Sequence, residues 1–213
     1  MENPVRGVAA ATVAVVGTAS VRIEPDEAFV FITLTKTESG AGPALTDVAT
    51  RGDALAELLD ELEVPSYDRS TTGISVSEEF DHTKDGRKAL GYRAASTVSV
   101  RLADTKLIGT IIMRCTEKLD ARIAGPNWWV SPDNPAWLEA ASQAAANARD
   151  KATAYAAGLD LKLGPLLALA EPTDGSPRRF ARAASAGRDM PIETGEQEVT
   201  ATIHATFTLL SSS

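Results

Sequence analysis

The order of strand-like and helix-like segments is the feature that most limits how this chain can fold. Apolar residues at period two predict strands, and apolar residues at helical spacing predict helices. In chain order these segments run β-β-α-β-β-α-β-α-β-β. Because strands and helices do not alternate strictly, the order favours an α+β fold with mixed, mainly antiparallel sheets and three helices. The expected strands are 11–23, 27–37, 68–80, 88–103, 119–130, 165–171 and 197–210, and the expected helices are 43–63, 104–118 and 134–157.

The pattern of apolar residues also predicts which strands and helix faces are buried. Strand 27–37 begins with apolar residues on both faces, which predicts a central position in its sheet. Strand 197–210 alternates, with Val199, Ile203 and Phe207 on one face. The helix residues expected to face inward are Leu45, Val48, Leu55, Leu58, Leu59 and Leu62; Leu107, Ile108, Ile111, Ile112 and Cys115; and Ala140, Ala141, Ala144, Ala148, Ala152 and Tyr155.

Turn and cap residues mark the ends of these strands and helices. Asp85 and Gly86, within Lys84-Asp85-Gly86-Arg87, predict a tight hairpin, since an Asp-Gly pair adopts the backbone angles that such turns require. Asp104 is expected to cap the second helix. The Asn134-Pro135 pair predicts the start of the longest helix, and Gly158 its C-cap. Gly17 predicts an interruption or bulge in the first strand.

The domain organisation follows from the same segments. Residues 1–11 are expected to form a tail and residues 12–210 the folded domain. The second half contains β-α-β-α-β, which is compatible with a ferredoxin-like lobe and with two α+β lobes dividing near residue 103. Residues 172–192 are rich in Arg, Ala, Ser and Pro and are expected to be a mobile loop.

Charge and composition exclude some partners and indicate a compartment. The chain carries 21 Lys and Arg against 29 Asp and Glu, a net charge of −8, which opposes binding to nucleic acid. No apolar run is long enough to span a bilayer. The apolar segment 7–19 follows an acidic start and reads as a strand, not as a signal peptide. With a single cysteine as well, these features favour a cytoplasmic location.

No familiar catalytic or metal-binding pattern appears in the chain. His82 and His204 are the only histidines, and Cys115 lies among apolar residues, where burial disfavours a reactive thiolate. The nucleophile-elbow, zinc-protease and phosphate-loop motifs are absent. We therefore assign no catalytic, cofactor-binding or metal-binding residues, and this favours a non-enzymatic role over catalysis.

Two groups of residues are candidates for a contact between copies of the chain. Adjacent residues of a strand face opposite ways, so one of Trp128 and Trp129 can be buried while the other reaches an interface. The opposing interpretation is that the tryptophans close one end of the core. The expected loop 172–192 brings local positive charge to an acidic protein, and a merely solvated loop explains it equally well. Its arginines are Arg178, Arg179, Arg182 and Arg188.

Several stretches, in their order along the chain, are similar to the SIMPL-domain family. The opening run Val13 to Asp26 resembles the family's first strand, with Ala19 at a position that is usually glycine. The hairpin around Asp85 and Gly86 and the alanine-rich helix ending Tyr155-Ala156-Ala157-Gly158 are also similar. Pro191-Ile192-Glu193-Thr194-Gly195 resembles the family's entry to its closing strand, with Thr194 in place of proline. The resemblance covers roughly residues 12–210.

The resemblance implies a role in stress or envelope physiology and self-assembly, because the family includes an oxidative-stress defence protein and a periplasmic immunogenic antigen. It supplies no catalytic residues. Two hypotheses remain. The first is a non-enzymatic, self-associating scaffold or binding module, whose partner is itself or another protein. The second is a small-ligand binder or an enzyme with an unusual site at a subunit junction.

Overall fold

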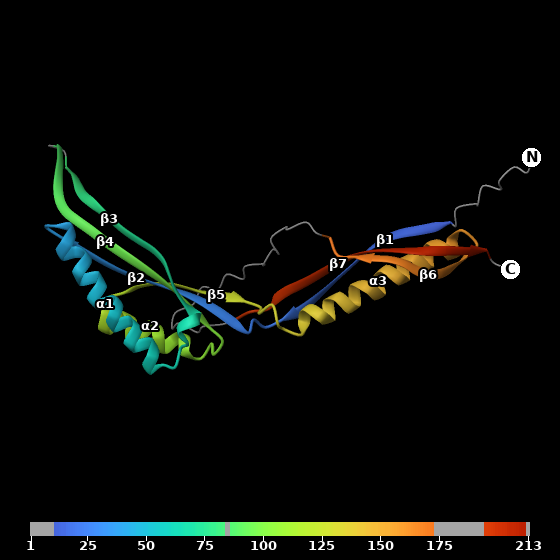
Figure 1. Ribbon diagram of the computed structural model, residues 1–213, viewed down its shortest axis with the longest axis horizontal. Coiled ribbons are helices and arrows are strands. Elements are labelled where there is room, and N and C mark those ends of the chain that lie inside the picture. The colour runs from blue at the N-terminus through green and yellow to red at the C-terminus, as the bar shows by residue number, and fades with distance from the viewer. Residues whose placement is uncertain (1–10, 84–85, 173–193, 212–213) are drawn as a thin grey trace, which may run out of the picture. The chain divides into compact units, whose positions relative to one another are not determined.

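A computed structural model describes residues 11–83, 86–172 and 194–211 of the chain (Figure 1). Contacts divide these residues into two units. The four-stranded unit comprises residues 25–131 with residue 194, and the three-stranded unit comprises residues 11–24, 132–172 and 195–211. The four-stranded unit is thus an insertion between the first strand and the last helix of the three-stranded unit. The predicted α+β class and the predicted element order are both confirmed.

The four-stranded unit contains an antiparallel sheet with the order β3-β4-β2-β5. The chain passes from β2 through α1 to the long β3–β4 hairpin, and then through α2 to β5 (Figure 1). As predicted, β2 is central, with β4 and β5 as its neighbours. The elements are β2 (Glu27–Glu38), α1 (Ala41–Glu61), the 3-10 turn η1 (Ser66–Asp68), β3 (Arg69–Thr83), β4 (Gly86–Leu102), α2 (Leu107–Leu119) and β5 (Arg122–Trp129).

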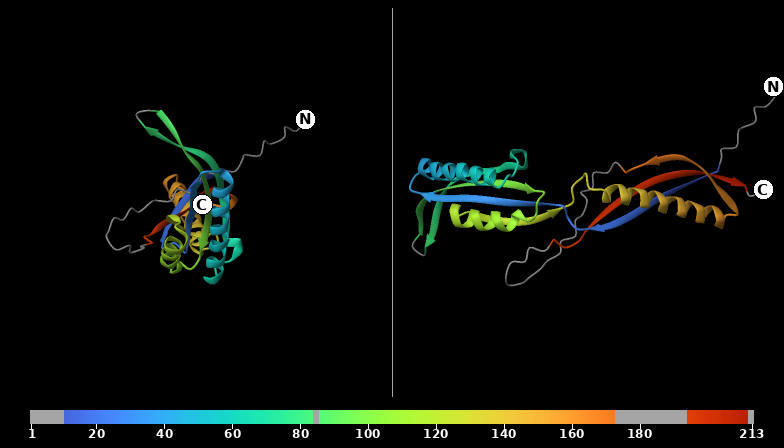
Figure 2. Two further views of the ribbon diagram at one scale, coloured as in Figure 1. Left: turned by 90° about the vertical axis from the view of Figure 1, so that its left-hand side faces the viewer. Right: turned by 90° about the horizontal axis from the view of Figure 1, so that it is seen from below.

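Both helices of this unit cover the same face of the sheet (Figures 1 and 2). Val30, Ile32 and Leu34 of β2 and Val100 of β4 point to that face and are almost fully buried. The opposite face is rich in hydroxyl side chains, and the hydroxyl groups of Thr33 and Thr97 lie 3.0 Å apart across β2 and β4. The strands therefore carry apolar residues on one face and polar residues on the other, which suits a sheet with helices on one side only.

The three-stranded unit contains an antiparallel sheet with the order β1-β7-β6 and one long helix. Val199, Ile203 and Phe207 of β7, which the sequence places on one face, are buried, as predicted, and so are Gln197 and Ala205. Val15, Ile203, Ala205 and Phe207 form a second core with Ala144, Ala148 and Ala152 of α3. The elements are β1 (Thr12–Ile23), α3 (Ala136–Gly158), β6 (Leu161–Ala170) and β7 (Gln197–Ser211).

Gly17 allows α3 to approach the sheet closely. Its strand pairs with β7 without interruption, so the predicted bulge at Gly17 is wrong. A Cβ at this position would lie 2.1 Å from the carbonyl oxygen of Ala144 and 2.7 Å from the Cβ of Ala148. Only hydrogen fits between the strand and the helix there. The buried row of α3 is correspondingly small: Ala136, Ala140, Ala144, Ala148, Ala152 and Ala156.

Some local predictions need correction. Tyr155 and Leu45 were expected to face inward, but they are exposed, and Ala156 and Ala44 are buried in their place. The buried rows continue at a spacing of four residues, from Val48 back to Ala44 and from Ala152 on to Ala156, so the exchange is confined to one end of each row. Gly158 lies within α3 and the C-cap is Leu159, because Asp160 adopts the left-handed conformation (φ 57°) and turns the chain into β6. As a result, β6 begins four residues earlier than predicted.

The structure has no boundary near residue 103, since β4 and β5 on either side of it both pair with β2. The ferredoxin-like arrangement suggested for the second half does not form, because α2 and β5 belong to one unit while α3, β6 and β7 belong to the other. No helix in the described part of the chain is both long enough and apolar enough to cross a membrane.

Candidate interaction surface

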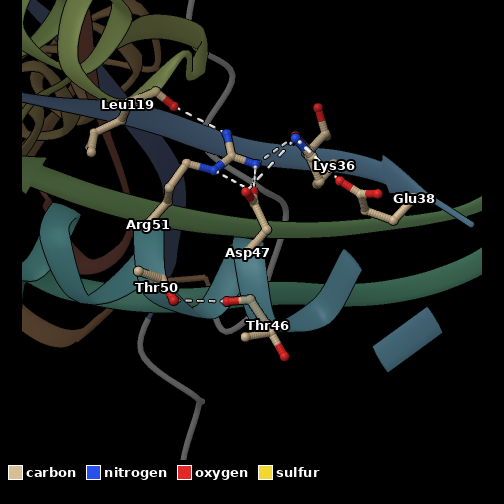
Figure 3. Close-up of polar contacts among 8 residues, drawn as sticks. Lys36, Glu38, Thr46, Asp47, Thr50, Arg51 and Leu119 are labelled. Carbon is tan, nitrogen blue, oxygen red and sulfur yellow. Dashed lines mark hydrogen bonds and ion pairs between the residues drawn. The ribbon is translucent and has the colours of Figure 1, made fainter. Parts of the chain in front are cut away.

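Arg51 lies at the centre of a polar cluster in the four-stranded unit (Figure 3). Its guanidinium donates hydrogen bonds to the carbonyl oxygens of Thr35 (2.7 Å) and Leu119 (3.2 Å), and to the carboxylate of Asp47 (2.7 Å). Lys36 lies 3.9 Å from the same carboxylate. The cluster joins β2, α1 and the end of α2. Because the guanidinium is engaged by groups of its own chain, we interpret it as a structural clamp and not as a catalytic centre.

Arg101 forms a second cluster beside η1. Its guanidinium contacts the carboxylate of Asp68 at 2.6 Å and that of Glu27 at 3.1 Å. Both carboxylates are largely buried and have a cation to neutralise them, which is the requirement for burying a charge. This cluster fastens η1 to β4 and β2, and it also offers no unengaged acid or base.

Two residues weighed for chemistry in the sequence, His204 and Cys115, belong to different units. His204 is exposed on the polar face of β7. Cys115 is fully buried in α2, and burial raises the pKa of its thiol to about 11 although the charge of Arg114 acts in the opposite direction. In the described ranges no three His, Cys, Asp or Glu side chains gather to hold a metal ion.

Sheet edges are the surfaces through which such a protein can pair with another chain, and three of the four edges are obstructed. The edge of β1 is engaged by α3: Lys151 donates to the carbonyl of Val16 (2.8 Å), and the amide of Thr18 donates to Asn147 (3.2 Å). The edge strand β5 is short and carries a register shift and Pro126. The edge strand β6 carries Pro165, which has no N–H, and two register shifts.

The edge of β3 is less obstructed: it carries register shifts at Thr71/Gly73 and Glu79/Phe80, but it has no proline, and residues 74–79 pair with β4 without interruption. The strand is 15 residues long, and its exposed stretch 70–77 contains neither a charged residue nor a proline. Ile74 is 69% exposed and Val76 is 38% exposed. Val76 pairs with Ala94, which is buried beneath the helices, so both apolar side chains point to the helix side of the sheet. Helix α1 lies mainly over β4 and β2, and it leaves this part of β3 uncovered.

The outer half of the β3–β4 hairpin extends this apolar surface. Tyr92 and Leu90 of β4 are 36% and 52% exposed. The hairpin projects away from α1 and α2 in both views (Figures 1 and 2). We call β3 residues 70–77 together with Tyr92 the hairpin edge. The sequence shows that residues 70–77 are uncharged, but only the sheet order shows that they lie at an edge.

Trp128 and Trp129 lie at the end of β5, and the structure separates them as the alternation of a strand requires. Trp128 is half-buried against the helix-covered core. Trp129 lies on the other face, where its ring meets Phe29 edge to face with centroids 6.4 Å apart. Both indoles are packed within their own unit, so they offer less apolar surface for a contact between copies than the hairpin edge does.

Several predicted residues fall outside the described part of the chain. Arg178, Arg179, Arg182 and Arg188, with the expected loop that carries them, lie there, and so does Asp85. Gly86 is the first residue of β4 and pairs with Thr83, so β3 and β4 form a hairpin in which Gly86 lies in the strand.

Comparison with known proteins agrees with this architecture. The model of the SIMPL family, described as a protein of unknown function (DUF541), matches residues 13–207. A comparison with curated proteins found no match. The matched region includes every strand and helix of both units, in whole or in large part, and covers nearly the whole chain. The chain therefore belongs to the SIMPL family.

Proposed function

We propose that this protein is a non-enzymatic, self-associating binding module, and that its copies pair through the hairpin edge. The observation that carries the proposal is the exposed, uncharged stretch 74–77 of the edge strand β3, which pairs with β4 without interruption. An edge strand without charge or proline presents unpaired backbone N–H and C=O groups, and soluble proteins normally block such edges or use them for pairing. By contrast, α3 engages Val16 and Thr18 at the edge of β1, and the edge strands β5 and β6 each carry a proline, whereas β3 carries register shifts but no proline.

Antiparallel pairing of β3 with β3 of a second copy satisfies both edges under two-fold symmetry. The two copies of Ile74 and Val76 then lie on the same face, across the new strand pair. Such cross-strand apolar pairs contribute roughly 0.2–1 kcal/mol each. The pairing also covers apolar side chains that α1 leaves exposed. A related form of the proposed function is pairing of the same edge with a strand of a different protein in place of a second copy.

Val76→Lys is the variant that tests the pairing. It places a charge on the apolar side of the edge strand, the device by which natural edge strands avoid pairing. We expect it to shift the protein toward 22.4 kDa monomers in size-exclusion chromatography with light scattering. Leu138→Lys, at an exposed leucine of α3, is the matched control and is expected to leave the assembly intact. Equal assembly of both variants would exclude the hairpin edge from the contact.

The arginines of residues 172–192 are proposed to lie at the margin of the contact between copies. Exposed charge pairs are screened within about 10 Å at 0.1 M salt. If Arg178, Arg179, Arg182 and Arg188 contribute, assembly weakens as salt is raised. Salt-independent assembly would leave the hairpin edge as the contact and would remove the arginines from it.

The cytoplasmic location and the connection with stress also belong to this proposal. The location is supported by residues 12–23, which form β1 and pair with β7 along their whole length, as a strand of the folded domain would. N-terminal sequencing of the native protein tests it, and a mature start beyond Ala19 would contradict it. The connection with stress is supported by the family resemblance alone.

A further inference from the structure

The three-stranded unit contains an apolar groove between α3 and β6. Its volume is about 760 Å³, within the range of roughly 300–1,000 Å³ that is common for small-molecule sites. The floor is formed by Ile203, Ala205 and Phe207 of β7, which are at most 8% exposed. Leu166 and Leu169 of β6 form one wall and remain 49% and 57% exposed.

The groove exists because the side of α3 that faces β6 carries mostly short side chains. Helix residues four apart lie on one face, and the row over β6 is Ala145, Arg149, Thr153 and Ala157. The helix rests mainly on β1 and β7, where Gly17 lets it come close. Over β6 the row has no large apolar side chain, so the leucines of β6 stay uncovered. Concave apolar surface of this kind is a common mark of a ligand site.

Two cations accompany this apolar lining. Arg149 contributes from α3 and Lys162 from β6. No Asp or Glu lines the groove, although the chain as a whole is acidic, with a net charge of −8. Neither cation forms an ion pair with any residue that the structure describes. The groove therefore combines a hydrocarbon surface with positive charge that is available to an anionic group.

We propose that the groove binds a fatty carboxylate: its single acyl chain lies against the leucines of β6 and the floor of β7, and its carboxylate pairs with Arg149 and Lys162. An added peptide strand suits the groove less well, since Pro165 and the register shifts interrupt the edge of β6 beside it. This site lies within one unit and is independent of the proposed pairing through the hairpin edge.

The test is calorimetric titration of the full-length protein with octanoate, decanoate and dodecanoate below their micelle concentrations. We expect one site per chain and an affinity that rises about two- to fourfold with each methylene group, because each buried methylene contributes hydrophobic free energy. Dodecanol, which has the same chain without the charge, is expected to bind several-fold more weakly at low salt.

Variants locate the site. Thr153→Trp fills the groove and is expected to abolish binding, whereas Ala146→Trp, on the same helix but outside the lining, is its control. The double variant Arg149→Gln/Lys162→Gln should weaken dodecanoate roughly tenfold and leave dodecanol unchanged, with Arg22→Gln on β1 as the control for charge. Circular dichroism melting curves verify that each variant is folded.

Four outcomes overturn the proposal. The first is no binding of any carboxylate, and the second is binding that Thr153→Trp leaves intact. The third is binding of vesicles of anionic phospholipid without binding of the free carboxylate, which assigns the groove to a membrane surface. The fourth is loss of self-association in Thr153→Trp with no carboxylate binding by the unmodified protein, which assigns the groove to a second copy. Because Val76→Lys does not touch the groove, failure of the hairpin-edge proposal is recognised separately.

Discussion

Gly17 of β1 lies directly beneath Ala144 of α3, so close that a Cβ on Gly17 would stand 2.1 Å from the carbonyl oxygen of Ala144. This contact sets how closely the helix approaches the sheet. It also determines the groove, since a helix seated tightly on β1 and β7 with short side chains over β6 leaves the leucines of β6 uncovered.

Gly17→Ala is expected to destabilise the three-stranded unit, because the added methyl group must push α3 away from the sheet. Overpacking of this kind costs roughly 1–3 kcal/mol, and here the neighbour is backbone that cannot turn aside. Urea unfolding followed by far-UV circular dichroism measures the change. Gly158→Ala, also in this unit and with nothing within 4 Å of its added Cβ, is the control and should not destabilise the protein. Equal stability of both variants would contradict the close contact.

Gly91→Ala is expected to weaken the β3–β4 hairpin. Gly91 adopts φ +126°, which side chains disfavour, and a Cβ there would lie 2.3 Å from the carbonyl oxygen of Glu38. The substitution should lower the melting temperature by several degrees. Gly73→Ala, in the paired strand β3 and with open space around it, is the comparison. A melting curve unchanged by Gly91→Ala would mean that the backbone is not held in this conformation.

Arg51→Met is expected to lower the free energy of unfolding by about 2–3 kcal/mol. It removes donors to the carbonyl oxygens of Thr35 and Leu119 and leaves them without their partner. Arg51→Lys should recover only part of the loss, since an ammonium cannot reproduce the fork of the guanidinium. Denaturant titration provides the measurement, with the exposed Arg122→Met as control. Full recovery by lysine would show that only the charge matters.

The Cys115 thiol gives a pH dependence whose sign can be worked out. Its pKa is raised from an ordinary value of 9.0 to about 11 in the folded chain. Below pH 9 the thiol is protonated in both the folded and the unfolded chain. Between about pH 9 and 11 only the unfolded chain loses the proton, so stability falls as pH rises, by up to about 2 kcal/mol.

Two measurements test this behaviour. Cys115→Val has no thiol to titrate. Its free energy of unfolding should therefore fall less between pH 9 and 11 than that of the unmodified protein. At pH 8 a thiol-specific reagent should label the native chain far more slowly than the chain in urea. Rapid native labelling would contradict the burial of this residue.

The sequence predicts the elements of this fold well and their grouping poorly. The apolar patterns of β2 and β7 are local, and they predict the central position of β2 and the buried face of β7. The division into units depends on a partnership across the chain: β1 packs with α3 and β7, more than 100 residues away. Nothing local to residue 24 or residue 132 records that partnership.

The two candidate sites differ in the same way. The sequence shows that residues 70–77 are uncharged, but they are available for pairing only because the sheet order leaves β3 at an edge. The groove depends on the helix row Ala145, Arg149 and Thr153, which has no large apolar side chain and lies opposite Leu166. Helical spacing reveals the row, but only the helix–sheet packing reveals what it faces. The tryptophans, by contrast, were conspicuous in the sequence and are packed largely within their own unit.

Self-association is the central claim, and light scattering coupled to size-exclusion chromatography tests it most directly. The unmodified protein is measured from low to high micromolar concentration. Pairing through the hairpin edge predicts a mass at least twice the 22.4 kDa of one chain at the upper concentrations, and a return to the single-chain mass in Val76→Lys. A mass of 22.4 kDa for the unmodified protein at every concentration would contradict it.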